Sequence, residues 1–310
     1  MRLEPDDLVC RVKRIQAQIR DHVAAHLESQ TPEALAAVAD EAPGDTIYAV
    51  DRVGDELLTG LFHEEMGEAS CVLIGEGLND GGVSLPPGTD PGSADYRIIV
   101  DPIDGTRGLM YDKRSAWILT GVAENRGPET SLQHIFVAVQ TEIPTRKQYR
   151  QDVLWGIRGC GAGVEASSRL TGEAVPAELR PSQAESIEHG FAMISRFFPG
   201  GKDVLCQLEH ALTEELIGPV VPGKARLFED QYISSGGQFY ELMAGHDRFN
   251  ADLRPNLESV LADRGEALGR RLDAPMDTTS PIAWVGYANR RLRERIEPVL
   301  QRLLREYGLL

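Results

Sequence analysis

The sequence has few cysteines and no long apolar run. Its four cysteines are scattered along 310 residues, with no Cys-x-x-Cys pair and no histidine at ligand spacing. This spacing excludes a disulfide framework and a common zinc site, so we expect buried free thiols at Cys10, Cys71, Cys160 and Cys206. No stretch approaches the roughly 18 apolar residues of a membrane helix, and the first residues lack the apolar core of an export signal. We therefore expect a soluble, cytoplasmic protein with no membrane partner.

Basic residues are also scarce relative to acidic ones. The 32 Lys and Arg residues are outnumbered by 48 Asp and Glu residues, which gives a formal net charge of −16. Nucleic acids and anionic membranes are bound by concentrated Lys and Arg, so this charge argues against both as partners. A small phosphorylated substrate is still compatible with it, because divalent cations held in a carboxylate pocket reverse the local sign.

The remaining composition is that of an ordinary globular protein, with 42% hydrophobic and 26% charged residues. A chain of this length can bury one large core or two smaller ones. The polar, proline-bearing stretch from Ser167 to Ser186 is the best candidate boundary. We therefore expect an N-terminal α+β lobe at 1–175 and a C-terminal α/β lobe at 176–310.

Hydrophobic periodicity predicts helices and strands in both halves. Apolar residues at steps of three and four predict a helix from Pro5 to about Leu27, and a segment opening at Thr31 follows. Further helices are expected at 52–62, 203–217, 235–243, 257–268 and 289–307, with Pro298 kinking or restarting the last one. Strands are expected at 71–75, 98–101, 116–122, 135–140, 153–157, 190–197 and 282–287, and a long loop at 76–95.

The strongest functional signal is the segment 97–106, Arg-Ile-Ile-Val-Asp-Pro-Ile-Asp-Gly-Thr. An apolar, β-branched run leads into Asp101, and the carboxyl end of such a strand is the usual ligand position in α/β proteins. Pro102 and Gly105 let the chain fold back, which would bring the carboxylates of Asp101 and Asp104 together. Two such carboxylates beside a hydroxyl suit Mg²⁺ or Mn²⁺. The alternative is an Asx-type turn with two solvated aspartates.

This motif resembles the signature of the inositol monophosphatase family. That family belongs, with fructose bisphosphatases and bisphosphate nucleotidases, to a superfamily of metal-dependent, lithium-sensitive phosphatases. The resemblance implies a layered α-β-α-β-α sandwich of the sugar phosphatase type in two lobes. It also implies a magnesium cofactor, with two or more ions per chain. Members are commonly dimers, although a homodimer is not readable from this sequence.

The resemblance assigns metal ligands in the N-terminal lobe. The run Cys-Val-Leu-Ile-Gly-Glu is similar to the family strand whose glutamate, here Glu76, binds the first metal. Asp101 would bridge two ions that lie about 3.5–4 Å apart. Glu76 and the carbonyl of Ile103 would complete one site, and Asp104 would serve the other. Taken alone, Glu76 reads as a solvated loop residue.

Further roles concern the attacking water and the phosphate. The segment Asp-Thr-Ile-Tyr-Ala-Val-Asp51 resembles the family segment whose last aspartate orients that water together with Thr106, although the family usually has threonine at Tyr48. Alternatively, or in addition, Asp51 caps the helix expected at 52–62. The backbone N–H groups of Gly105 and Thr106 would hold phosphate oxygens if a helix starts there.

The last metal aspartate has two candidates, because the family's Trp-Asp-x-Ala-Ala-Gly motif is absent in its usual form. Aligning 235–245 with the family's Gly-Gly helix places Asp252 on the ligand position and Glu241 on a substrate-contacting glutamate. Asp230 is the competitor, but it precedes the glycines. Arg254 and the proline after it replace two alanines of the family motif, a departure beyond the ligand.

A second departure is the lack of any Lys or Arg between Arg20 and Arg52, where family members often carry a lysine near the metals. Arg107, Lys113 and Arg114 are the nearest basic residues that could meet a substrate, and the alternative is that they are solvated loop cations.

The sequence therefore predicts a hydrolase that cleaves a small, inositol monophosphate-like phosphate monoester with Mg²⁺ by a two-metal mechanism. Alternative activities are those of a fructose-1,6-bisphosphatase or a 3′-phosphoadenosine phosphatase. A different class of alternative is a non-catalytic descendant that binds metal or phosphate. The altered motif at Asp252 and the missing basic residue motivate it.

Overall fold

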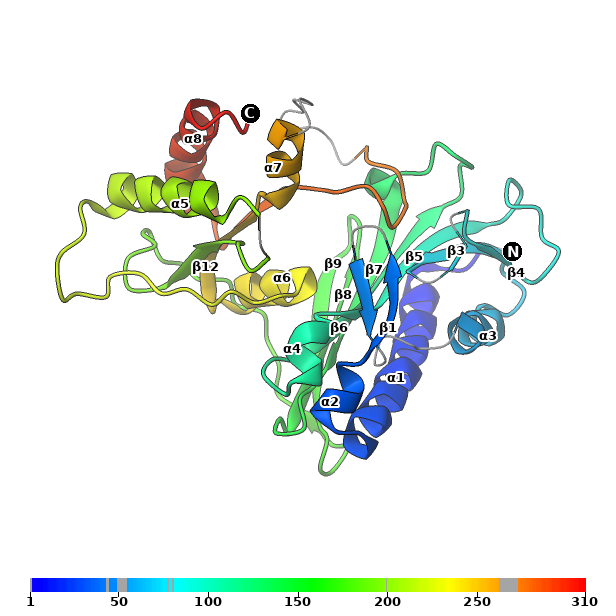
Figure 1. Ribbon diagram of the computed structural model, residues 1–310. Coiled ribbons are helices and arrows are strands. Elements are labelled where there is room, and N and C mark those ends of the chain that lie inside the picture. Colours follow the sequence, from blue (N-terminus) through cyan, green and yellow to red (C-terminus); the bar gives the residue numbers. More distant parts are fainter. Residues whose placement is uncertain are drawn as a thin grey trace. The chain divides into compact units, whose positions relative to one another are not determined.

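The protein is described by a computed structural model covering residues 2–42, 45–48, 55–76, 78–79, 81–198, 200–261 and 273–310. It separates into two compact units, drawn together in Figure 1. Unit 1 is Met1–Glu178 with Arg271–Ser280, and unit 2 is Leu179–Arg270 with Pro281–Leu310. The sequence prediction placed its boundary between 175 and 176 and did not include the return of residues 271–280 to unit 1.

Unit 1 is built on an eight-stranded mixed sheet in the order β10-β9-β8-β7-β6-β5-β3-β4. Neighbouring strands are antiparallel except β3 and β5, which pair in parallel. The strands are β3 (Cys71–Gly75), β4 (Val83–Leu85), β5 (Tyr96–Asp104), β6 (Ala116–Glu124), β7 (Ile135–Ile143), β8 (Arg150–Ile157), β9 (Gly161–Ser168) and β10 (Ala174–Val175). A separate hairpin consists of β1 (Val38–Ala42) and β2 (Asp45–Tyr48).

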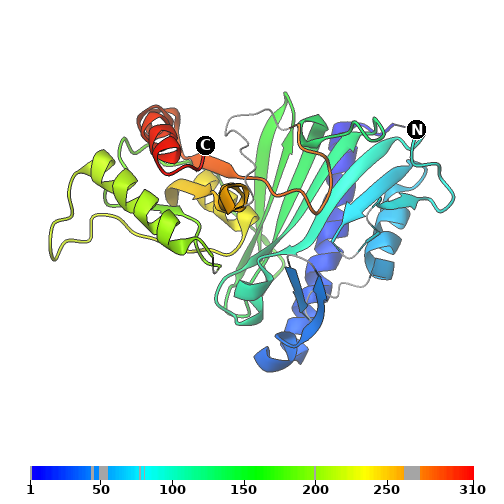
Figure 2. The ribbon, with the colours of Figure 1, turned by 45° about the horizontal axis from the view of Figure 1, so that its top comes forward.

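Helices α1 (Pro5–Ser29) and α3 (Asp55–Met66) lie against one face of this sheet, as Figure 2 shows, and α2 (Pro32–Leu35) follows α1. The apolar stripe that predicted α1 is buried in the core against β6 and β7, which confirms that helix. Gln16 is fully buried within the stripe. Its amide nitrogen donates to Thr120 Oγ1 at 2.8 Å, and its amide oxygen accepts from Thr141 Oγ1 at 2.7 Å. The one polar side chain of the stripe is therefore satisfied, as a buried amide must be.

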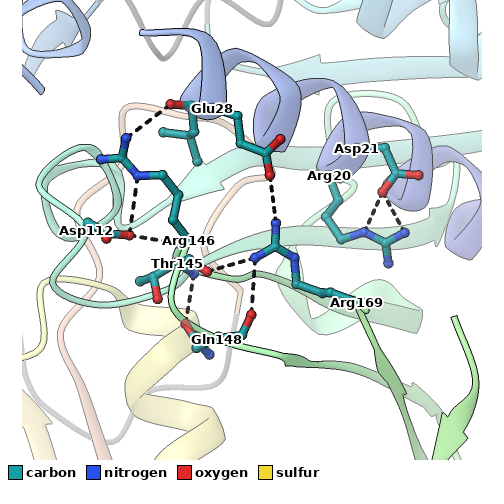
Figure 3. A network of polar contacts seen from close by, with 9 residues as sticks. Arg20, Asp21, Glu28, Asp112, Thr145, Arg146, Gln148 and Arg169 are labelled. Carbon is teal, nitrogen blue, oxygen red and sulfur yellow. Dashed lines mark hydrogen bonds and ion pairs between the residues drawn. The ribbon is translucent and has the colours of Figure 1, made fainter. Parts of the chain in front are cut away.

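A polar network ties the C-terminal end of α1 to the connection between β7 and β8 (Figure 3). Arg169 Nη1 donates to the carbonyl oxygen of Thr145 at 3.0 Å, and Arg169 Nη2 donates to Glu28 Oε1 of α1 at 3.4 Å. In the same connection, the backbone N–H of Arg146 donates to Asp112 Oδ1 at 2.8 Å. The turn that carries Asp112 directly follows the short helix α4 (Thr106–Met110). The network therefore holds one flank of the Asp101–Thr106 turn in place.

Unit 2 contains a three-stranded sheet in the order β11-β12-β13. Strand β11 (Phe191–Ile194) is parallel to β12 (Asp247–Asp252), which is antiparallel to β13 (Trp284–Tyr287). Its helices are α5 (Lys202–Ile217), α6 (Ser235–Ala244), α7 (Arg254–Leu261) and α8 (Arg290–Glu306). Leucines of α5 and α8 form a shared core with Phe249 and Ala251 of β12. These two helices therefore cover one face of the sheet.

Most long elements agree with the sequence prediction, and the differences concern short strands. Strand β4 lies inside the predicted loop 76–95, where it pairs with β3. Strand β9 begins where glycine-rich turns were expected, and only one of its residues is buried. Strand β12 was not predicted at all. These strands exist because a neighbouring strand supplies their hydrogen bonds, a signal that local periodicity does not contain.

Some predicted helices also differ from the structure. Helix α7 begins at Arg254, before the predicted start at 257, and the predicted end near 268 lies outside the described residues. Helix α8 runs through Pro298 without restarting. Its buried leucines on both sides of the proline pack into the unit 2 core, which offsets the cost of one missing N–H.

The prediction of buried thiols is wrong for three of the cysteines. Cys71 is buried in β3, and burial raises the pKa of its thiol to about 12. Cys10, Cys160 and Cys206 are exposed, although all four are free. Cys10 and Cys206 fall between the buried positions of α1 and α5, where the helical period turns them outward. No helix among the described residues has the length and apolar character needed to cross a membrane.

Candidate functional site

The first half of the candidate site lies where two parallel strands of unit 1 end. Gly75 of β3 is paired with Val100 of β5, so Glu76 and Asp101 each follow a paired position at the same edge of the sheet. A Cβ atom on Gly75 would lie 3.1 Å from both the side chain and the carbonyl oxygen of Val100. A larger residue would push the strands apart at this point. The glycine therefore helps to keep the ends of β3 and β5, which lead into Glu76 and Asp101, close together.

A β-bulge at the end of β5 places both aspartates on one face of the sheet. Asp101 is paired with Leu119 of β6 and Asp104 with Trp117, and the register shifts between them. Directly paired residues of antiparallel strands point to the same side, and Leu119 and Trp117 share a face because they are two apart. In a regular strand, residues three apart would point to opposite faces. Pro102 lies in this bulge, where a residue without an N–H is tolerated.

The turn after the bulge is closed by local hydrogen bonds. The backbone N–H of Ile103 donates to Asp101 Oδ1 at 3.0 Å, and the hydroxyl of Thr106 donates to the Ile103 carbonyl at 2.9 Å. The first of these is the Asx-type bond of the alternative interpretation. Asp101 and Asp104 are nevertheless partly buried rather than solvated, and Thr106 is buried. The turn thus combines Asx geometry with an oxygen-rich surface.

Gly105 makes the strand-to-helix step possible. Its φ of 103° lies in the region open to glycine, and it caps α4, which begins at Thr106 as the phosphate-binding expectation required. Of the basic residues nearby, Lys113 is exposed, whereas Arg107 and Arg114 are partly buried. Their role toward a substrate stays a prediction.

The donors of this half fit a hard cation in their chemistry. Two aspartates, one glutamate and a backbone carbonyl offer only oxygen ligands, which Mg²⁺ and Mn²⁺ prefer. Across the described residues, however, no three Asp, Glu, His or Cys side chains come together as a group that could hold a metal ion. Asp51, predicted to orient the attacking water, lies outside the described residues. The backbone arrangement, rather than a preformed cluster, therefore supports the ligand prediction.

The second half of the predicted site belongs to unit 2, and there Asp252 has a different environment. Asp252 ends β12 and is buried. Arg254 Nε donates to Asp252 Oδ1 at 2.8 Å, and Arg254 Nη2 donates to Oδ2. A guanidinium thus occupies both carboxylate oxygens in a fork. Both oxygens of this carboxylate are therefore already paired with a positive charge, and the metal-ligand role that the resemblance assigned to Asp252 stays a prediction.

The other predicted residues of unit 2 are Glu241 and Asp230. The carboxylate of Glu241 lies 2.5 Å from His246 Nδ1, just beyond the C-terminal end of α6. Its assignment as a substrate contact stays a prediction. Asp230 is partly buried in the segment that precedes α6. Neither Asp230 nor Asp252 belongs to a metal-binding group of the described residues, so the choice between them as a metal ligand also stays a prediction.

A buried ion cluster near the end of β11 was missed by the sequence analysis. Glu209 of α5 is 8% exposed, accepts the backbone N–H of Ile194 at 2.7 Å, and pairs with Arg196, which also pairs with Glu229. Burial raises the pKa of Glu209 to about 7, against the lowering effects of the Ile194 N–H and of Arg196. Its position on the buried stripe of α5, between Leu208 and Leu212, was the available signal.

Comparison with known proteins gives a fold but no close relative. No protein-family model matches the chain, and no curated protein matches it significantly. An IMPase (inositol monophosphatase) of Thermotoga maritima aligns over 96% of this chain and 100% of its own, at 15% identity and a TM-score of 0.54. Fructose-1,6-bisphosphatase of Leishmania major, in holo form, aligns over 79% of this chain and 72% of its own, at 14% identity and a TM-score of 0.54.

The shared fold identifies the structural class of the chain. A mixed sheet flanked by helices, shared with both structures, makes the chain an α/β sandwich protein of the sugar phosphatase type, as predicted. The likeness concerns the fold, which the chain shares with an IMPase and a fructose-1,6-bisphosphatase and which is the fold that the resemblance implied.

Proposed function

We propose that this protein hydrolyses a small phosphate monoester with the help of bound Mg²⁺ or Mn²⁺. One observation carries the proposal. The bulge in β5 puts Asp101 and Asp104 on one face, at the same sheet edge as Glu76. The fold that the chain shares with two phosphatases, an IMPase and a fructose-1,6-bisphosphatase, supports the same reaction class.

Each residue of the turn has a defined part in this proposal. Glu76, Asp101, Asp104 and the Ile103 carbonyl would hold the cation. When bound, a divalent cation neutralises phosphate charge and makes water more acidic. The Thr106 hydroxyl, positioned by its bond to Ile103, would orient the attacking water together with Asp51. The N–H groups at the start of α4 would hold phosphate oxygens, since phosphoryl transfer depends mainly on positioning and charge neutralisation.

The proposal does not assign a second metal ion to Asp252. Its carboxylate is held by the Arg254 guanidinium in a bidentate pair, and a fixed positive charge there repels a second dication. The cation site therefore rests on the residues of unit 1.

A substrate panel tests the proposal. Purified protein is incubated with inositol 1-phosphate, fructose 1,6-bisphosphate or adenosine 3′,5′-bisphosphate, in Mg²⁺ or in EDTA, and released phosphate is measured. We expect release from at least one ester in Mg²⁺ and none in EDTA. Release from no phosphomonoester would refute the enzyme proposal. The net charge of −16 argues against nucleic acid or an anionic membrane as partner and is compatible with a small phosphorylated one.

A non-catalytic, metal- or phosphate-binding role is the second candidate. The Asp252–Arg254 pair favours it, because an altered ligand position is what loss of activity would leave behind. Calorimetric titration with Mg²⁺ alongside the substrate panel separates the two candidates. Mg²⁺ binding without hydrolysis of any ester would select the non-catalytic role.

A further inference from the structure

An arginine and two aromatic rings meet where the parallel strands of unit 2 end. Ile194 of β11 is paired with Ala251 of β12, and the chain continues three residues beyond each to Phe197 and Arg254. The guanidinium carbon of Arg254 lies 4.3 Å from the ring centre of Phe197 and 5.0 Å from that of Phe198. Rings at these distances attract a cation and restrict its planar group.

Asp252 fixes the orientation of this guanidinium. It accepts from Nε and Nη2, one edge of the fork, and its side chain is only 7% exposed. The Arg254 side chain is 29% exposed. Nη1 has no hydrogen-bonding partner among the described residues. The second edge of the fork, formed by Nη1 and the other N–H of Nη2, is therefore available to a ligand.

We propose that Arg254 binds a phosphate group at unit 2 through this second edge, and that Asp252 is the positioning residue that holds Arg254 rather than a metal ligand. The inference rests on the proposed function for the identity of the phosphate ester. A guanidinium edge matches two phosphate oxygens in a bidentate pair, and a neighbouring carboxylate sets its orientation before the ligand arrives.

This assignment explains why the pair exists. A buried ion pair adds little net stability compared with apolar residues of the same size. The end of a parallel strand pair is the usual ligand position in α/β sheets, and an arginine held by a carboxylate and two rings loses little freedom on binding an anion. The substitution of arginine for alanine in the family motif thus supplies a fixed positive charge within the chain.

Calorimetry on the full chain tests the inference with two ligands, MgCl₂ alone and then inorganic phosphate in saturating Mg²⁺. We expect Arg254→Lys to weaken phosphate binding by about tenfold or more, because the fork is lost. Asp252→Asn should weaken phosphate binding several-fold while the number of Mg²⁺ ions bound per chain stays at the wild-type value. Arg302→Lys on α8 changes an arginine paired with Glu215 and Glu306 and should leave both titrations unchanged.

Three results would overturn the inference: loss of one Mg²⁺ per chain in Asp252→Asn, phosphate binding by Arg254→Lys within twofold of wild type, or no phosphate binding by wild type. If Asp252→Asn does not fold, Asp252→Glu replaces it, and the same comparison applies.

Failure of the proposed function gives a different set of results. If no ester is hydrolysed but Arg254→Lys weakens phosphate binding, the function fails and the inference stands. If esters are hydrolysed and Asp252→Asn loses an ion, the inference fails and the function stands.

Discussion

Asp101 in unit 1 and Asp252 in unit 2 both lie at or near the end of a β-strand, yet they have different partners. Asp101 accepts a backbone N–H within its own turn and shares a face with Asp104. Both carboxylate oxygens of Asp252 accept hydrogen bonds from the guanidinium of Arg254. Two neighbouring carboxylates repel each other unless a cation binds beside them, whereas a guanidinium next to a carboxylate already supplies the positive charge. The neighbour two or three residues further on therefore decides the chemistry of a strand-end aspartate.

The two chain segments that follow explain the difference. After Asp101, a proline in the bulge and a glycine with positive φ bring the second carboxylate and a hydroxyl back to the strand end. After Asp252, α7 starts at Arg254, whose side chain turns back over the strand end toward Phe197. Four experiments test how far this contrast holds.

The largest effect is expected from Asp101→Asn. Removal of this charge should lower kcat/KM for the best ester by about a thousandfold or more, because the cation loses its central ligand. Asp252→Asn is the matched variant, with an expected loss of about tenfold that appears mainly in KM. Initial-rate kinetics in saturating Mg²⁺ measure both. Equal losses in the two variants would show that the aspartates share one role.

The second largest effect concerns Glu209, beside the strand end of unit 2. Its pKa is raised from 4.5 in the unfolded chain to about 7, so the folded protein favours the protonated form. The resulting stability is complete below pH 4.5 and is lost as pH rises through 7. The shift corresponds to about 3 kcal/mol in the free energy of unfolding. Urea unfolding between pH 4.5 and 8 measures it.

Glu209→Gln is the control for this pH dependence. The amide oxygen can still accept from Ile194 and Arg196, but it does not titrate. The variant should lack the fall in stability toward pH 8. A fall of the same size in the variant would assign the pH dependence to other groups.

A smaller effect is expected from Gly105→Ala in the unit 1 turn. A side chain at φ 103° costs about 1–2 kcal/mol of folding free energy. Gly159→Ala is the matched control, because Gly159 has a φ of 81° and open space around it in the turn between β8 and β9. Both variants should lose stability in urea, but only Gly105→Ala should lose activity, since it displaces Thr106. Full activity in Gly105→Ala would separate the turn from the reaction.

The smallest effect is expected from Phe197→Leu. The substitution keeps an apolar side chain but removes one ring from the Arg254 guanidinium, at a cost of about 0.5–1 kcal/mol. Phe228→Leu is the control, because Phe228 pairs with the ring of Phe191 and no cation is described over it. Phosphate affinity should fall in Phe197→Leu and not in Phe228→Leu. An unchanged affinity in both would show that the Phe197 ring does not help to hold Arg254.

Local sequence was enough to predict the strand ends that carry Glu76 and Asp101 in unit 1, and the metal-binding role of these residues stays a prediction. The apolar run before Asp101, the glycine before Glu76 and the residues that allow a tight turn are all visible in the chain, and the structure places Glu76 and Asp101 at one sheet edge. The unit 2 half could not be predicted in the same way. Strand β12 has little apolar alternation of its own and depends on pairing with β11 and β13. The rings that face Arg254 come from a segment more than fifty residues earlier.

The sequence by itself was enough to predict the fold class, because the Asp-Pro-Ile-Asp-Gly-Thr motif and the apolar stripe of α1 depend on neighbours within a few positions of the chain. Only the tertiary structure decided that the bulge turns Asp101 and Asp104 to one face, that Glu209 is buried beside Arg196, and that Asp252 belongs to Arg254. Pairing register, burial and the partner of a charge are set by residues distant in the chain. Two carboxylates that both lie at or near the end of a β-strand can therefore acquire different chemistry.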